Sequence, residues 1–352
     1  MRARSAPRAE PNRERLLVID PELDSQADFS ITDLPDFLER GDALILNDAA
    51  TLPASLRAAV DLELRLLSLL DDGTWLALSF GEGDARMPTE LRGKPRELWA
   101  GSRLDFGSGL SARVVAVDRA SPRLLRIAFE QTGSLLWQAL YRAASPIQYA
   151  YIERPLSLWD VQNAYSARPW AFELPSAGKP LRFETLFRIE ARGVNIAHVT
   201  HAAGISSTGD PELDQRLPLT ERYEIGESSA ALVNQTKLAG GRVIAVGTSV
   251  TRALEAASES GSVRAGREST SLLLGPGSRL RSCDALLTGL HEPGTSHYAL
   301  LEAFAPRALL DRSFRHAERA GYEQHEFGDS CLILRGALRA TPKAPSGTRL
   351  AA

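Results

Sequence analysis

Histidine and cysteine, the usual metal-binding residues, are scarce in this chain of 352 residues, which has six histidines and two cysteines. Two cysteines, Cys283 and Cys331, can form neither a disulfide framework nor a four-ligand zinc site. His198 and His201 lie three apart in an expected strand, so they face opposite sides and cannot chelate one ion. We therefore expect no metal, and we expect both thiols to be reduced and partly buried.

Long apolar runs are also missing, because no stretch reaches the eighteen residues that a membrane-spanning helix requires. The first twelve residues are charged and lack the apolar core of a signal peptide, so we expect a cytoplasmic protein without membrane contact. Hydrophobic residues make up 43% and charged residues 24%, which excludes disorder, collagen and coiled coil for the whole chain. The net charge of −3 argues against a uniformly basic nucleic-acid binder but not against a local basic patch.

Apolar runs of the length of a strand alternate with helical patterns in both terminal parts of the chain. Ala43–Leu46 is a continuous apolar run and predicts a strand buried on both faces. Phe183–Arg192 has the spacing of a helix, and Arg242–Gly247 predicts a second buried strand. We expect a larger α/β domain of mixed α+β type, formed by residues 1–56 and 146–336.

The hydrophobic pattern of the sequence changes in residues 57–145, where short apolar or alternating segments are separated by turn residues. This pattern is typical of short strands and predicts a small, barrel-like all-β domain inserted into the larger one. Residues 337–352 are expected to form a loose tail.

One strand-to-helix turn has the properties of a ligand site. After the expected strand at Arg242–Gly247, Thr248 and Ser249 begin a helix, whose free N–H groups attract a carboxylate or phosphate. A plain turn with Ser249 as the helix cap is an equally good interpretation.

Loop residues supply the candidates for proton transfer. His291, Glu292 and His325 lie in polar segments next to expected strands or helices, and loop-borne histidine and glutamate are natural acid–base groups. A surface or capping role for each histidine is the alternative, and the sequence leaves it open.

Several blocks, in order along nearly the whole chain, resemble the S-adenosylmethionine:tRNA ribosyltransferase-isomerases of queuosine biosynthesis. Arg242–Glu255 is similar to a characteristic block of that family, and Gly41–Leu56 looks like its GD-L-L-N-T-R-V-I-P-A-R-L segment. Pro175–Gly178 matches its P-T/S-A-G segment, and Gly328-Asp329 matches the end of its final Y-G-D motif.

The resemblance implies a large α/β domain with a smaller all-β insert and a reaction on tRNA. The ribosyl unit of S-adenosylmethionine would be transferred to a 7-aminomethyl-7-deazaguanine base in the anticodon loop and isomerised, giving epoxyqueuosine and releasing adenine and methionine. S-adenosylmethionine would thus be a ribosyl donor, and no metal would be needed. Such chemistry requires a base that removes a ribose proton beside the sulfonium, for which His291, Glu292 and His325 are the candidates. The residues expected to bind S-adenosylmethionine are Pro175, Ser176, Ala177, Gly178, Gly247, Thr248 and Ser249.

The chain departs from the family pattern at polar positions. Where the family has Thr-Arg-Val and a second arginine, this sequence has Ala49-Ala50-Thr51 and Ser55, and Lys179-Pro180 stands where the family has a histidine. Lost arginines weaken contacts with an RNA backbone. The pattern fits a divergent paralogue, so a different, non-tRNA acceptor or a non-catalytic relative are the alternatives.

Overall fold

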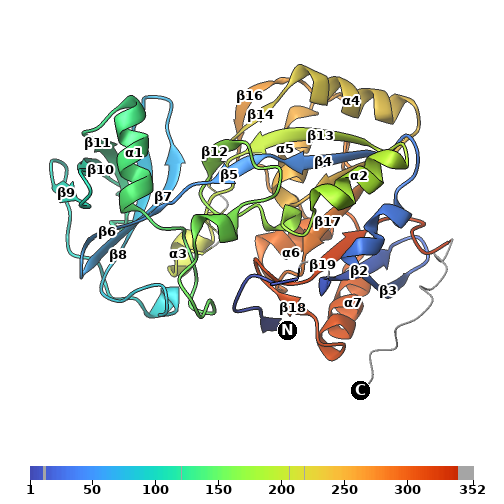
Figure 1. Ribbon diagram of the computed structural model, residues 1–352, viewed down its shortest axis with the longest axis horizontal. Helices are drawn as coiled ribbons and strands as arrows, with labels where there is room; N and C mark the ends of the chain where they lie inside the picture. The colour runs from blue at the N-terminus through green and yellow to red at the C-terminus, as the bar shows by residue number, and fades with distance from the viewer. Residues whose placement is uncertain (11–12, 120, 206, 218, 340–352) are drawn as a thin grey trace.

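The computed structural model describes residues 1–10, 13–119, 121–205, 207–217 and 219–339. It shows a mixed α/β protein in which one sheet has nine of the described strands and another has six (Figure 1). The mixed α/β class and the barrel-like sheet that the sequence predicts are both present. The exact domain boundaries at 56, 146 and 336 stay a prediction.

The nine-stranded sheet has the strand order β16-β14-β13-β4-β15-β17-β19-β2-β3. Its centre is parallel from β13 through β4 and β15 to β17, whereas β19 is antiparallel to β17 and parallel to β2. The outer strands β3, β14 and β16 pair in an antiparallel manner. The strands are β2 (Arg15–Asp20), β3 (Ser25–Ser30), β4 (Ala43–Asn47), β13 (Asn195–His201), β14 (Glu221–Ile225), β15 (Val243–Val246), β16 (Gly266–Thr270), β17 (Ala285–Gly289) and β19 (Ser330–Ile333).

Helices cover both faces of this sheet, which explains why its central strands are apolar throughout. In β4, Ala43 and Ile45 belong to one core cluster, while Leu44 and Leu46 belong to the cluster on the other face. The strand buried on both faces that the apolar run predicts is therefore confirmed. The covering helices are α4 (Glu227–Leu238), α5 (Thr248–Ala257), α6 (Ser296–Leu301) and α7 (Arg307–Arg319) on the first face, and α2 (Phe183–Ala191) with the 3₁₀ helix η2 (Ile31–Phe37) on the second.

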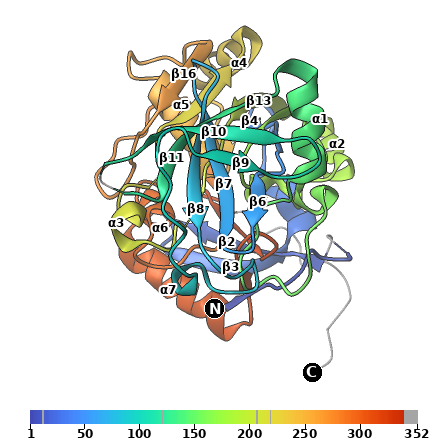
Figure 2. The same cartoon turned by 90° about the vertical axis from the view of Figure 1, so that its left-hand side faces the viewer.

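The second sheet is antiparallel, with the order β6-β7-β8-β11-β10-β9. Figure 2 views the protein from the side on which this sheet lies. It has its own core around Trp75. The expectation that residues 57–145 are entirely β is wrong in one place, because the helix α1 (Gly133–Ala143) packs on this core. Leu136, Ala139, Leu140 and Ala143 have helical spacing, and all four contact this core. The strands are β6 (Ser55–Ala59), β7 (Leu62–Leu69), β8 (Trp75–Phe80), β9 (Arg103–Asp105), β10 (Ser111–Val117) and β11 (Leu124–Phe129).

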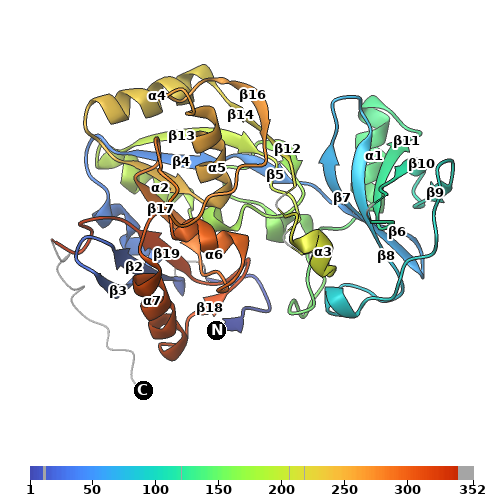
Figure 3. The ribbon, with the colours of Figure 1, turned by 180° about the vertical axis from the view of Figure 1, so that it is seen from behind.

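Two short strand pairs bring distant parts of the chain together. Strand β1 (Arg2–Ala3) pairs with β18 (Glu323–Gln324), so the N-terminal arm lies beside the last part of the described chain, as Figure 3 shows from behind. Strand β5 (Ala49–Thr51) pairs with β12 (Arg168–Ala171). The remaining short elements are α3 (Pro211–Asp214), η3 (Thr89–Leu91), η4 (Leu158–Val161) and η5 (Ser176–Gly178).

The expected tail at 337–352 falls mostly on residues 340–352, which lie outside the described residues. Ala337 and Leu338 pack against the sheet core, and the N–H of Leu338 donates to Asp20. None of the helices in the described ranges has the length and apolar character needed to cross a membrane.

Candidate active site

The strand ends of the nine-stranded sheet define one edge where polar residues from distant segments meet. The parallel strands β13, β4, β15 and β17 all finish there. Because β19 is antiparallel to β17 and parallel to β2, those two strands begin at the same edge, and Gly289 pairs with Ser330 as Ser330 pairs with Leu16. In open α/β sheets, ligands bind outside the carboxyl ends of the strands.

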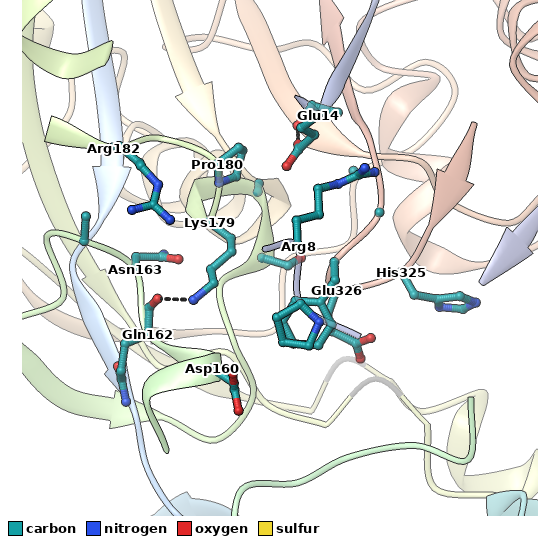
Figure 4. Close-up of a pocket in the computed structure, with 18 of the residues that line it drawn as sticks. Arg8, Glu14, Asp160, Gln162, Asn163, Lys179, Pro180, Arg182, His325 and Glu326 are labelled. Atoms are coloured by element: carbon teal, nitrogen blue, oxygen red, sulfur yellow. Dashed lines mark hydrogen bonds between the residues drawn. The ribbon is translucent and has the colours of Figure 1, made fainter. Parts of the chain in front are cut away.

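A pocket of about 630 Å³ opens at this edge (Figure 4). Its volume lies within the range of small-molecule sites. The N-terminal arm contributes one wall, and the other lining residues are Ala50 of β5, several residues within 158–166 and 176–182, Gly289 at the end of β17, and residues 325–330.

The bend at Pro175–Gly178 contributes two of its four residues to the lining, namely Ser176 and Ala177. Gly178 lies behind them, where a Cβ atom would come within 1.9 Å of the hydroxyl oxygen of Tyr165. Only glycine fits there without movement of a neighbour. The bend is therefore a tightly packed part of the wall, with its middle residues accessible to a ligand.

The strand-to-helix turn at Gly247 supports this wall from behind. Gly247 has a φ of 98°, and a Cβ atom on it would lie 3.4 Å from the Cβ of Ala177. Gly247 itself is the N-cap residue of α5, and no side chain caps this helix, so the alternative interpretation with Ser249 as the cap is wrong. Gly247, Thr248 and Ser249 are outside the set of residues that line the pocket.

One wall of the pocket is cationic. Lys179 and Arg182 both line it, and Figure 4 shows them on the same side. The ammonium group of Lys179 donates to the backbone oxygen of Gln162 at 2.7 Å, and burial lowers the pKa of this lysine. At the same wall, Trp159 lines the pocket while 83% of its surface is exposed.

The opposite wall begins with an ion pair. Arg8 donates to Asp329 at 2.6 Å, and the buried Asp329 carboxylate also accepts the N–H groups of Arg15 at 3.0 Å and Glu323 at 2.8 Å. These contacts hold the Asp329 side chain in place and tie the N-terminal arm to the start of β19.

Glu14 is a second carboxyl group on this wall, and only 7% of the residue is exposed. The hydroxyl of Ser330 donates to it at 2.5 Å. Burial raises the pKa of Glu14 to about 8, although the Ser330 hydrogen bond and Arg8 act in the opposite direction. Nearby Asp329 adds to the rise in the pKa. Glu14 therefore loses its proton at a much higher pH than an exposed glutamate does.

Of the three residues expected to transfer protons, His325 lines the pocket. Its ring stacks on Tyr151 with centroids 4.5 Å apart. Glu292 lies just outside the lining, 3.7 Å from the His325 ring, and accepts a hydrogen bond from the amide of Gln324 at 2.8 Å. The structure therefore brings His325 and Glu292 together at the margin of the pocket.

His291 is not among the lining residues. Its Nε2 lies 2.8 Å from the hydroxyl of Thr288, and its ring stacks on His297 at 5.1 Å. Burial, with smaller contributions from His297 and His325, holds the pKa of His291 well below its usual value. His291 is thus a neutral imidazole at physiological pH.

The other histidine pair behaves as strand geometry requires. The His198 ring lies 6.0 Å from that of Tyr165, whereas His201 is fully buried on the other side of β13, 3.4 Å from Glu221. Within the described part of the chain, no group of three or more His, Cys, Asp or Glu side chains is placed to hold a metal ion.

Comparison with known proteins identifies the chain at the family level. The family model described as "Queuosine biosynthesis protein" matches residues 2–333. The chain belongs to this family. Its curated relatives include two S-adenosylmethionine:tRNA ribosyltransferase-isomerases. The enzyme of Acidiphilium cryptum is 33% identical over 89% of this chain and 90% of its own length, and that of Parvibaculum lavamentivorans is 31% identical over 91% of each.

A solved structure confirms the fold of this queuosine biosynthesis family member. The crystal structure of S-adenosylmethionine tRNA ribosyltransferase from Thermotoga maritima superimposes with a TM-score of 0.52 and 21% identity, covering 94% of this chain and 96% of the other. The family resemblance drawn from the ordered blocks is therefore confirmed, as is the prediction that the chain is an enzyme.

Sequence reasoning missed the pocket residues of the N-terminal arm and of the segment before the bend. Arg8, Glu14, Asn163 and Arg182 were not predicted, although all four line the pocket. The available signal is weak, because charged residues beside a buried strand are common in any protein. Only the order of strands in the sheet shows that Glu14, just before β2, lies next to Ser330.

Proposed function

We propose that this protein transfers the ribosyl moiety of S-adenosylmethionine to a 7-aminomethyl-7-deazaguanine base in tRNA and isomerises it to epoxyqueuosine, with release of adenine and methionine. The observation that carries the proposal is the charge distribution of the pocket in a chain of this family. Lys179 and Arg182 lie on one wall, and Glu14 and Glu326 lie on the other (Figure 4).

This polarity suits the donor. S-adenosylmethionine has a carboxylate at one end and a positive sulfonium near its centre, so it needs both a cationic and an acidic environment. Neither Lys179 nor Arg182 has a carboxylate partner within ion-pair distance among the described residues, so both are available to a carboxylate of the ligand. Arg8 is less available, because Asp329 already neutralises it.

The residues expected to bind S-adenosylmethionine have two different roles in the proposed function. Ser176 and Ala177 contact the donor directly, while Pro175, Gly178 and the turn at Gly247–Ser249 hold the bend in place behind them. His325 and Glu292, at the margin of the pocket, are placed to serve the acceptor amine. His291 supports the loop that carries Glu292.

Exposed aromatic residues support RNA as the acceptor. Trp159 presents an open ring at the cationic wall, and Phe183 and Phe187 form an exposed stacked pair immediately after Arg182. Aromatic platforms beside cations bind unstacked bases, and each stacked base contributes about 1–3 kcal/mol. This arrangement favours a single-stranded loop over a helical stem.

The experiment is direct. The purified protein is mixed with S-adenosylmethionine and tRNA carrying the 7-aminomethyl-7-deazaguanine base, and adenine release and tRNA mass are followed together. We expect adenine and the modified nucleoside in equal amounts, and a large loss of activity in Lys179→Met. The matched control is Lys94→Met, outside the pocket lining. No adenine release at any enzyme concentration would refute the proposal.

One observation favours a second candidate, a ribosyl transfer from S-adenosylmethionine to a non-tRNA amine. Ala50 lines the pocket at a position where the family resemblance places an arginine, so one cation is missing from the site. A protein of this kind would be stabilised by S-adenosylmethionine by roughly 2.7 kcal/mol at one hundred times the dissociation constant. It would release adenine with a small amine but not with tRNA.

A further inference from the structure

Four acidic side chains line the pocket, and three of them have partners that hold their charge or orientation. Asp160 forms an ion pair with Arg154 at 2.9 Å. Burial acts to raise the pKa of Asp160, but the hydrogen bonds from Arg154 and Ser157 outweigh it and lower the pKa to about 2. Asp329 pairs with Arg8. Glu326 accepts a hydrogen bond from the Tyr151 hydroxyl. Each of these three carboxylates therefore already has a charged or hydroxyl partner.

The fourth, Glu14, differs from the two aspartates because it has no ion pair, and from the half-buried Glu326 because only 7% of it is exposed. Its partner in the described structure is the neutral hydroxyl of Ser330, which donates to Oε1, and no described cation forms an ion pair with it. The nearby guanidinium of Arg8 instead donates to Asp329. Among the residues that the structure describes, none donates a hydrogen bond to Oε2 of Glu14, since Ser330 donates to Oε1.

The second observation is where the group points. Figure 4 shows the Glu14 carboxyl group directed into the pocket, across from Lys179 and Arg182. A ligand whose carboxylate contacts those two cations would extend its remaining part toward Glu14. In S-adenosylmethionine, that part begins with the sulfonium and the ribose carbon attached to it.

We infer that Glu14 is the proton acceptor of this pocket and removes the ribose proton next to the sulfonium. This inference rests on the function proposed above. The C–H bond of the ribose carbon attached to sulfur breaks, and the proton forms an O–H bond on Oε2 of Glu14. The electron pair stays on the carbon, where the adjacent positive sulfur stabilises it. Burial supports this step, because it favours the neutral carboxyl group that the step produces.

The charges around Glu14 set its pH dependence. Arg8 and Arg4 of the N-terminal arm lower its pKa, as does the Ser330 hydrogen bond, whereas burial and Asp329 raise it, with a net value of about 8. The base must be ionised, so kcat/KM should rise with pH through this region. Removing the Ser330 hydroxyl should move the rising limb to higher pH, because one interaction that favours the carboxylate is lost.

The test compares Glu14→Gln, Glu14→Asp and Ser330→Ala with wild type, using adenine release with tRNA and calorimetric titration of S-adenosylmethionine. We expect Glu14→Gln to lower kcat by about 10²–10⁴-fold while it still binds the donor, and Glu14→Asp to retain part of the activity. The matched control is Glu10→Gln, which removes an exposed carboxyl group from the same arm and should behave as wild type.

The outcomes separate this inference from the function on which it rests. An active wild type with an equally active Glu14→Gln would overturn the role of Glu14 alone. A Ser330→Ala variant whose pH limb does not move would also count against it, because a merely structural glutamate would leave the limb unchanged. A wild type that binds S-adenosylmethionine but never releases adenine would instead refute the proposed reaction.

Discussion

Glu14→Gln should make this protein more stable, and the gain should depend on pH. In the folded protein the Glu14 carboxyl group is buried, and its pKa is raised from 4.5 to about 8 by that burial. In the unfolded chain the same group is in water and ionises at its usual pKa. Between these two pKa values, folding requires the uptake of a proton, which costs free energy that an uncharged glutamine does not incur.

The magnitude follows from the two pKa values. A group whose pKa is raised in the folded state stabilises the fold fully below its unfolded pKa and loses that contribution as pH rises through its folded pKa. At roughly 1.36 kcal/mol per pH unit, the loss for Glu14 is about 1 kcal/mol at pH 5 and roughly 4 kcal/mol at pH 8. Glutamine is close in shape and can keep a hydrogen bond to Ser330.

Urea unfolding at pH 5 and pH 8 measures this effect. The midpoint of Glu14→Gln should lie close to that of wild type at pH 5 and well above it at pH 8, with little change in the slope. Glu10→Gln is the control, since the Glu10 side chain is 65% exposed, and it should leave the difference between the two pH values as in wild type. If Glu14→Gln loses as much stability as wild type from pH 5 to pH 8, the carboxyl group is not buried as described.

Three further results are expected. Gly178→Ala should cost about 1–3 kcal/mol in urea unfolding, and less in a Tyr165→Phe background, because the tyrosine hydroxyl is the atom nearest to the new Cβ. Burial lowers the pKa of His201 to about 4, so this histidine takes up a proton when the chain unfolds at mildly acidic pH. Wild type therefore loses stability between pH 7 and pH 4.5, and in His201→Phe this loss should be smaller by roughly 2–3 kcal/mol. Trp159→Ala should weaken tRNA binding in a filter assay by about 1–3 kcal/mol, whereas Trp99→Ala, which removes another exposed tryptophan from outside the pocket lining, should not.

The elements that the sequence predicted best are those whose pattern is local. The apolar runs that became β4 and β15 are buried on both faces, and a continuous apolar run of that length is typical of such a buried strand. Helix α2 was also predictable, because its apolar positions repeat at the helical period. Helix α1 was missed because it follows several strands, and its pattern was interpreted as a continuation of them.

The candidate site was less predictable because it depends on the order of strands in space. Strand β2 lies beside β19, more than three hundred residues later, and only this pairing places Glu14 next to Ser330. No local pattern encodes such a neighbour. Residues of the bend at Pro175–Gly178 could be predicted from the family resemblance, yet the resemblance does not distinguish Ser176, which lines the pocket, from Gly178, which supports it.

The two arginines that this chain lacks relative to the family pattern have different meanings in the structure. Ser55 does not line the pocket, and its hydroxyl donates to Glu63. Arg65 and Arg92 form ion pairs with Glu63, so this carboxylate has cationic partners without an arginine at position 55. Ala50 does line the pocket, so relative to the family pattern one positive charge is missing from its lining. Under the proposed function, Lys179 and Arg182 bind the carboxylate of the donor, so we expect the charge missing at Ala50 to affect the acceptor. An Ala50→Arg variant should therefore change which acceptor the protein uses, and it should leave the affinity for the donor nearly unchanged.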